Sequence, residues 1–218
     1  MNVLAFDTST QALQIALESE NNFTVYYMEK GLRHAELLMK KINEMMEQEG
    51  IRPADLDLVV CSRGPGSFTG LRIGLCAAKG LSDSLEIPFK TVSMLDVYGH
   101  CMSYFPGSVI PVIDARKNRF YGAVYQNGKR IGEYFDLDME SILSLDYIRY
   151  PALITGPDCS LFGEQSSDNI TVDGYGKRTV IKEFLYLGRK KHKDEGSDKK
   201  DISPLYIRKS DAELAKGK

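Results

Sequence analysis

The chain has 218 residues, 43% of them apolar, which is enough to bury one large core or two small ones. Its 28 basic and 30 acidic side chains nearly balance and its pI is about 6.0, which excludes the overall positive field of proteins that bind nucleic acid alone. The four cysteines lack C-x-x-C spacing and no segment has bilayer length, so we expect a cytoplasmic protein without a membrane span, disulfide framework or zinc site.

The first half of the chain begins with β-type runs and continues with alternating helical and strand patterns. The expected strands are residues 3–6, 13–17, 23–28, 58–61 and 89–92. The expected helices are residues 35–49, 67–85 and 94–104. The run at 58–61 is apolar throughout, which is typical of a strand buried on both faces.

The same order restarts at Val109, with strands expected at residues 109–113, 120–125, 130–135 and 152–155 and a helix near 139–145. Asn127 and Gly128 predict a type I′ hairpin turn, because both positions need positive φ. Two β-β-β-α-β-α units are the plan of the actin, Hsp70 and sugar-kinase fold. We therefore predict a duplicated actin-like ATPase fold (ASKHA, ribonuclease H-like) of the α/β class. Its first lobe would span residues 1–105, and a shortened second lobe with a C-terminal helix and tail would span 106–218.

An acidic residue ends the first strand of each predicted lobe: Asp7 in the first and Asp114 in the second. In the actin-like fold these positions face the nucleotide cleft. The hydroxyls of Thr8 and Ser9 also resemble a phosphate-binding turn, although Asp, Ser and Thr form such turns without a ligand. Both interpretations stay open, and we expect a degenerate or empty cleft, with weak ATP or ADP binding unproven.

The most informative segment is R-G-P-G-S-F-T-G-L-R-I-G at residues 63–74, directly after the buried strand at 58–61. Backbone amides reached through glycines can hold an anion or pack closely against another chain. The segment lacks the spacing and the lysine of a P-loop. Small residues recur along the following helix and predict a packing surface, either for the chain's own sheet or for a second subunit. They are Gly70, Gly74, Ala77, Ala78 and Leu81.

This segment closely resembles the TsaB (YeaZ) family, and the resemblance extends to residues 5–10, 33–36, 113–116 and 204–208. It implies a non-catalytic subunit of the machinery that makes threonylcarbamoyladenosine beside the tRNA anticodon. The implied partners are the TsaD transferase, which it would activate, and the TsaE ATPase. When TsaD is missing, a homodimer is implied. Contact with tRNA is expected only through the complex.

The resemblance also implies that the two first-lobe helices form the pairing surface. The residues assigned to it are His34, Leu38, Ile42, Met45, Gly70, Leu71, Gly74, Ala77, Ala78 and Leu81. A bulky substitution at Gly74 is then expected to weaken pairing without unfolding the lobe.

Catalytic groups are not expected. The family's catalytic paralogue holds a metal through two histidines four residues apart, and Met94 and Tyr98 occupy the corresponding positions here. The three histidines, His34, His100 and His192, show no paired spacing, so no metal is predicted. Two other classes stay open: an independent actin-like ATPase working through Asp7 and Asp114, and a metallopeptidase, for which the missing histidine pair is the main difficulty.

The C-terminal part contains a basic run at residues 189–200 with interleaved acidic residues. This run either contacts tRNA phosphates or forms a solvated flexible segment, and we favour the flexible segment. Residues 204–208 should return to a packed lobe, and 209–218 should form a frayed tail.

Overall fold

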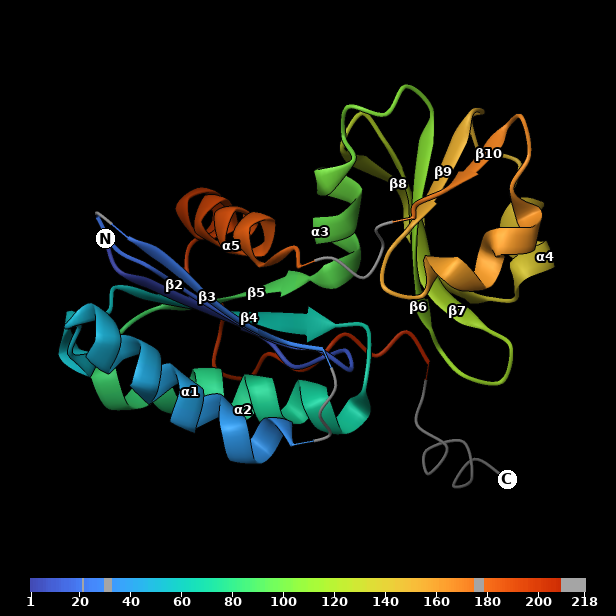
Figure 1. Ribbon diagram of the computed structural model, residues 1–218. Helices are drawn as coiled ribbons and strands as arrows, with labels where there is room; N and C mark the ends of the chain where they lie inside the picture. Colours follow the sequence, from blue (N-terminus) through green and yellow to red (C-terminus); the bar gives the residue numbers. More distant parts are fainter. Residues whose placement is uncertain (21, 30–32, 175–178, 209–218) are drawn as a thin grey trace. The chain divides into compact units, whose positions relative to one another are not determined.

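The computed structural model describes residues 1–20, 22–29, 33–174 and 179–208, so the predicted tail at 209–218 lies outside the described residues. The chain forms two compact units. Unit 1 contains Met1–Val97 and Arg178–Pro204, and unit 2 contains Tyr98–Lys177 and Leu205–Lys218. Each unit is built around one five-stranded sheet (Figure 1).

The sheet of unit 1 has the strand order β3-β2-β1-β4-β5. Its strands are β1 (Val3–Asp7), β2 (Leu13–Glu18), β3 (Phe23–Met28), β4 (Leu58–Gly64) and β5 (Phe89–Ser93). The first three form an antiparallel meander, and β4 and β5 continue the sheet in parallel with β1. β1 and β4 are central and covered on both faces, which explains their nearly continuous apolar sequences.

Helices cover both faces of this sheet (Figure 1). α1 (His34–Glu49) and α2 (Phe68–Leu85) pack on the face that carries Leu4 and Phe6, and α5 (Ile181–Glu195) packs on the opposite face, against β1, β2, β4 and β5. A short 3₁₀ turn, Pro53–Asp55, leads from α1 into β4. The predicted helices at 35–49 and 67–85 are therefore confirmed within one residue at each end.

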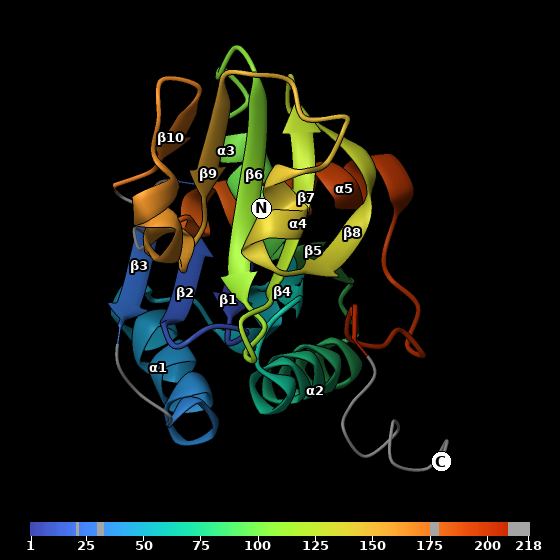
Figure 2. The same ribbon diagram turned by 90° about the vertical axis from the view of Figure 1, so that its right-hand side faces the viewer.

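Unit 2 repeats the topology of unit 1. Its strands are β6 (Ser108–Asp114), β7 (Phe120–Gln126), β8 (Lys129–Leu137), β9 (Ala152–Thr155) and β10 (Ile170–Val172). The order β10-β9-β6-β7-β8 places β6 at the centre, as Figure 2 shows, with the same parallel and antiparallel pairings as in unit 1. Gly64 and Gly156, which lie at the ends of the corresponding strands β4 and β9, have φ values of 103° and 104°. The predicted duplicated actin-like fold is confirmed.

Local features of unit 2 follow the predictions closely. Asn127 and Gly128 have φ values of 52° and 71°, as the predicted type I′ turn requires. After the second meander, the described residues of unit 2 form only short helical pieces, α4 (Met139–Leu143) and η2 (Cys159–Gln165), so the unit is shortened as expected. Arg208 donates hydrogen bonds to Asp136 and to the Ala115 carbonyl, which returns residues 204–208 to a packed unit.

The unit boundaries differ from the expected division between residues 105 and 106. The change from unit 1 to unit 2 falls between Val97 and Tyr98, inside α3 (Met94–Cys101). The predicted second lobe also included the C-terminal helix, but α5 belongs to unit 1. Its apolar residues Ile181, Phe184 and Leu185 are buried, and the chain has to return to unit 1 to cover the second face of that sheet.

The basic run at 189–200 is not a flexible segment, which corrects the favoured interpretation. Residues up to Glu195 belong to α5, and the following residues lie along the free edge of β5. Asp198 N donates to the Phe89 carbonyl (2.9 Å), and the Asp198 carboxylate accepts from Thr91 N (2.7 Å). Charged residues dominate this part of the sequence, although the inner face of the helix is apolar.

Candidate functional site

The turn after β1 is held by the glycine-rich segment that the sequence singled out. Ser67 N donates to the Ser9 carbonyl (2.7 Å), and the Thr8 hydroxyl donates to the Gly70 carbonyl (2.7 Å). A Cβ at Gly66 or Gly70 would overlap the carbonyl oxygens of Ser9 or Thr8. The glycines therefore let the start of α2 pack directly on the turn, and Ser67 caps the helix by accepting from Gly70 N.

Asp7 is fully buried at the end of β1. Its Oδ1 accepts a hydrogen bond from Ser9 N (2.8 Å), while Oδ2 has no hydrogen-bond partner among the described residues. The Ser9 hydroxyl is likewise buried without a partner in that part of the chain. Burial raises the pKa of the Asp7 carboxyl, although the hydrogen bond from the Ser9 backbone N–H opposes the rise. A protonated carboxyl or a nearby cation would satisfy this site.

Asp114 occupies the corresponding position in unit 2, at the end of β6, but its environment differs. Its carboxylate accepts from Arg116 N (2.7 Å) and lies 3.4 Å from the Arg116 guanidinium. Its backbone N–H donates to Asp158 Oδ2 (2.8 Å). Asp114 thus has protein partners, whereas Asp7 keeps an unpaired oxygen. The nucleotide cleft predicted between these two residues stays a prediction.

The residues assigned to the pairing surface lie mainly on the inner faces of α1 and α2. Leu38, Ile42 and Met45 of α1 are buried in the core of unit 1. In α2, Gly70, Leu71, Gly74 and Ala78 are also buried, and Ala77 and Leu81 are partly buried against the same core. The stripe of small residues therefore packs on the chain's own sheet, which was the alternative left open.

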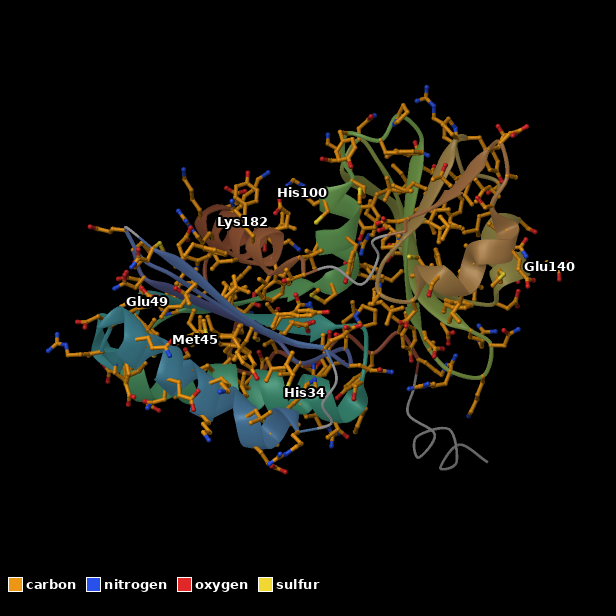
Figure 3. The ribbon with its side chains drawn as sticks, viewed as in Figure 1. His34, Met45, Glu49, His100, Glu140 and Lys182 are labelled. Atoms are coloured by element: carbon orange, nitrogen blue, oxygen red, sulfur yellow. The ribbon has the colours of Figure 1, made fainter. Side chains whose placement is uncertain are left out.

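His34 has a structural role at the entry to α1. It is buried, and its Nε2 lies 3.0 Å from the Thr10 carbonyl oxygen, so the ring ties the helix to the turn after β1. In Figure 3, His34 and Met45 lie on the α1 side of the sheet, and Lys182 lies on the α5 side. His34 therefore docks α1 onto the turn after β1.

A different set of residues forms the outer surface of these two helices, which lie side by side in Figures 1 and 2. Met39 of α1 and Phe68 of α2 are 45% and 41% exposed, and the Arg72 guanidinium lies 3.9 Å from the Phe68 ring centroid. Cys76 and Gly80 lie one and two turns after Arg72 in α2, and both are exposed. Helical spacing in the sequence identified the residues on the inner faces of the two helices. The residues on the opposite, outer faces were missed.

Positions 94 and 98 are occupied by methionine and tyrosine and not by a histidine pair. Met94 and Tyr98 are both buried, with exposed fractions of 1% and 2%. Across residues 1–20, 22–29, 33–174 and 179–208, no group of three or more His, Cys, Asp or Glu side chains is placed to hold a metal ion. None of the helices in the described part of the chain combines the length and apolar content needed to cross a bilayer.

Comparisons with known proteins agree with one another. The family model for TsaD, described as tRNA N6-adenosine threonylcarbamoyltransferase, matches residues 29–190. The tRNA threonylcarbamoyladenosine biosynthesis protein TsaB of Bacillus subtilis is 30% identical over 227 residues, covering 98% of this chain and 96% of that protein. TsaB of Escherichia coli is 29% identical over 150 residues, covering 68% of this chain and 64% of that protein.

Among solved structures, YeaZ from Pseudomonas aeruginosa superposes with a TM-score of 0.80 at 23% identity. The alignment covers 94% of this chain and 99% of that one. At this level of identity the similarity establishes the fold alone.

Proposed function

Because the chain belongs to the TsaB (YeaZ) family, we propose that it is a non-catalytic subunit in the biosynthesis of threonylcarbamoyladenosine in tRNA. The carrying observation is the similarity to Bacillus subtilis TsaB, which extends over 98% of the chain. In this proposal the chain pairs with a TsaD-type transferase and activates it, and a TsaE-type ATPase joins the pair. A homodimer forms when the transferase is missing.

The proposed absence of catalysis is supported by the side chains at the positions where the paralogue has its histidine pair. Met94 and Tyr98 are buried and make poor ligands for that metal. Ser67 of the glycine-rich segment caps α2 by accepting a hydrogen bond from Gly70 N. A peptidase is therefore not proposed.

We assign the pairing surface to the outer face of α1 and α2. Met39 and Phe68 supply exposed apolar area, and the small residues Cys76 and Gly80 leave room for a close approach by partner helices. The buried residues first assigned to this surface act through it indirectly, because they set the spacing of the two helices on the sheet.

The test uses Gly80→Arg, since a Cβ at Gly80 meets no atom within 4 Å. Replacing glycine in an exposed helix interior should not destabilise the fold, and arginine places a long charged side chain on the proposed contact. Leu161→Arg is the matched control, because Leu161 is 55% exposed in unit 2. Co-expression with the cells' own TsaD and size-exclusion chromatography report the pairing.

We expect the wild type and Leu161→Arg to co-elute with TsaD at equal ratio and Gly80→Arg to elute mainly alone. Normal pairing by Gly80→Arg would refute the surface and leave the function intact. Failure of the wild-type chain to pair with TsaD would refute the proposed function itself.

A second candidate is nucleotide hydrolysis by the isolated chain, favoured by the unpaired Asp7 Oδ2 and Ser9 Oγ. Against it, the Thr8 hydroxyl and the Ser9 carbonyl are both engaged by α2. ATP turnover by the purified chain that is lost in Asp7→Asn would establish this activity; absence of turnover and of ATP binding would remove it.

A further inference from the structure

The outer face of α5 carries a stripe of basic residues around one tyrosine. Its members are all exposed and recur at helical spacing (i, i+4, i+7, i+8 and i+11): Lys182, Tyr186, Arg189, Lys190 and Lys193. The opposite side of the helix is anchored, because Phe184 and Leu185 are buried and a Cβ at Gly188 would overlap Val60. The helix therefore presents these charges from a rigid position.

The stripe carries a local positive excess in a chain whose formal net charge is −2. Arg189 pairs with Glu18 of β2. Among the described residues, no ion pair engages Lys182, Lys190 or Lys193. The acidic residues on this side of α5 are the half-buried Glu183 and the exposed Asp194, which are outnumbered by the cations.

The edge strand β3 also carries exposed apolar side chains. Phe23, Val25 and Tyr27 are 38%, 41% and 37% exposed, and as alternate residues of one strand they lie on the same face. Their cross-strand partners on β2 are Glu18, Ala16 and Gln14, and directly paired residues of an antiparallel ladder share one sheet face.

That face is the one covered by α5. Gln14 Oε1 accepts a hydrogen bond from the Thr179 hydroxyl (2.8 Å) just before the helix, and Glu18 pairs with Arg189. The aromatic residues of β3 thus lie on the same side of the sheet of unit 1 as α5 with its basic stripe. Figure 3 shows Lys182 on this side of the sheet, opposite His34 and Met45, so these residues lie away from the outer face of α1 and α2.

We propose that this α5–β3 surface, formed by Lys182, Arg189, Lys190, Lys193, Phe23 and Tyr27, binds the tRNA substrate. The cations would contact backbone phosphates, and the two rings would stack on unpaired bases. Stacking on unpaired bases gives the rings a role that complements the phosphate contacts of the cations. This inference rests on the proposed function and adds a direct RNA contact to it.

The first test reverses three charges, in Lys182→Glu, Lys190→Glu and Lys193→Glu combined. The control combines Lys129→Glu, Arg130→Glu and Arg149→Glu, three exposed cations of unit 2 with the same total charge change. Fluorescence anisotropy with labelled unmodified tRNA is measured between 50 and 200 mM salt, for the TsaD complex and for the isolated chain.

We expect the α5 variant to bind tRNA at least about tenfold more weakly, with a salt-dependence slope shallower by about two to three. The control should stay within about threefold of the wild type. An equal loss in both variants, or no loss in the α5 variant, would overturn the proposal.

The second test removes the rings but keeps apolar side chains, in Phe23→Leu with Tyr27→Leu. We expect roughly fivefold to twentyfold weaker tRNA binding with an unchanged salt slope, because stacking does not release counterions. Unchanged tRNA affinity together with binding of the wild type to anionic lipid vesicles would assign the surface to a membrane and overturn the proposal. Size-exclusion chromatography of the same samples with TsaD shows whether pairing, and hence the proposed function, survives independently.

Discussion

Replacing Gly74 with leucine should destabilise unit 1, contrary to the expectation from the sequence that it would only weaken pairing. A Cβ at this position would lie 2.5 Å from the Thr8 hydroxyl oxygen and 3.9 Å from the Phe6 ring. Thr8 would have to turn away and abandon its buried hydrogen bond to the Gly70 carbonyl (2.7 Å). Leaving such a group unpaired costs about 1–3 kcal/mol, and overpacking the core adds about 1–3 kcal/mol.

Helix propensity works in the opposite direction, because glycine is about 1 kcal/mol less favourable than leucine in a helix interior. We therefore expect the free energy of unfolding to fall by about 3 kcal/mol in Gly74→Leu. Gly80→Leu, six residues along the same helix, is the matched control, since a Cβ there meets no atom within 4 Å. It should raise the free energy of unfolding by up to about 1 kcal/mol.

Urea unfolding followed by circular dichroism measures both variants against the wild type. A Gly74→Leu protein as stable as the wild type would show that the turn after β1 does not pack against α2 as described. A destabilised Gly80→Leu protein would show that Gly80 is not open to solvent. Either result would also remove the basis for distinguishing the inner and outer faces of α2.

Three further predictions concern charged groups that are buried or half-buried. Because burial raises the folded-state pKa of Asp7 above its ordinary 3.8, the folded chain binds this proton more tightly, and stability should fall as the pH rises from about 4 through the folded pKa. Asp7→Asn should lessen this fall in stability and be the more stable protein at pH 7. Urea unfolding at pH 4.5 and 7 checks both points. A steeper loss of stability with rising pH in the variant would contradict the argument. Arg208→Ala removes the guanidinium that pairs with Asp136, so the free energy of unfolding, measured with heat or urea, should fall by about 2 kcal/mol. Arg208→Lys should restore only part of this stability. No change in either variant would mean that the C-terminal segment is not anchored at Asp136. Asp198→Ala removes one of the carboxylates that neutralise the buried Lys90 and uncovers the edge of β5. We expect the free energy of unfolding to fall by about 2–3 kcal/mol and the backbone amides of β5 to exchange faster with solvent. Unchanged exchange would contradict the proposed cover of that edge.

The duplicated fold was predictable because its strands and helices have local patterns of apolar and polar residues, and these patterns recur in the same order. The alternation of β3 differs from the apolar runs of β1 and β4, and the same order of patterns returns after Val109. Turn chemistry at Asn127 and the cap at Ser67 depend on residues only one to three positions away. Such features are encoded within a few residues, so sequence reasoning locates them well.

A C-terminal helix was expected, but its residues and the unit to which it belongs were not identified. Its charged residues dominate the sequence around Lys190, and its inner face is the only apolar signal. Helical spacing of Ile181, Phe184, Leu185 and Gly188 does indicate an amphipathic helix once it is looked for. Which sheet it covers is a long-range matter, because residues 178–204 join a unit formed by the first 97 residues.

The family, the repeated topology and the existence of α1 and α2 can be derived from the amino-acid sequence, because motifs and periodicities are local properties of the chain. Which side of each helix faces the sheet becomes known from the folded structure alone. The stripe of Gly70, Gly74 and Ala78 is compatible with a subunit contact or with internal packing, and the turn after β1 takes up the space beside Gly70 and Gly74. The physical reason is that periodicity defines a helix face, whereas contacts from distant parts of the chain determine what that face meets.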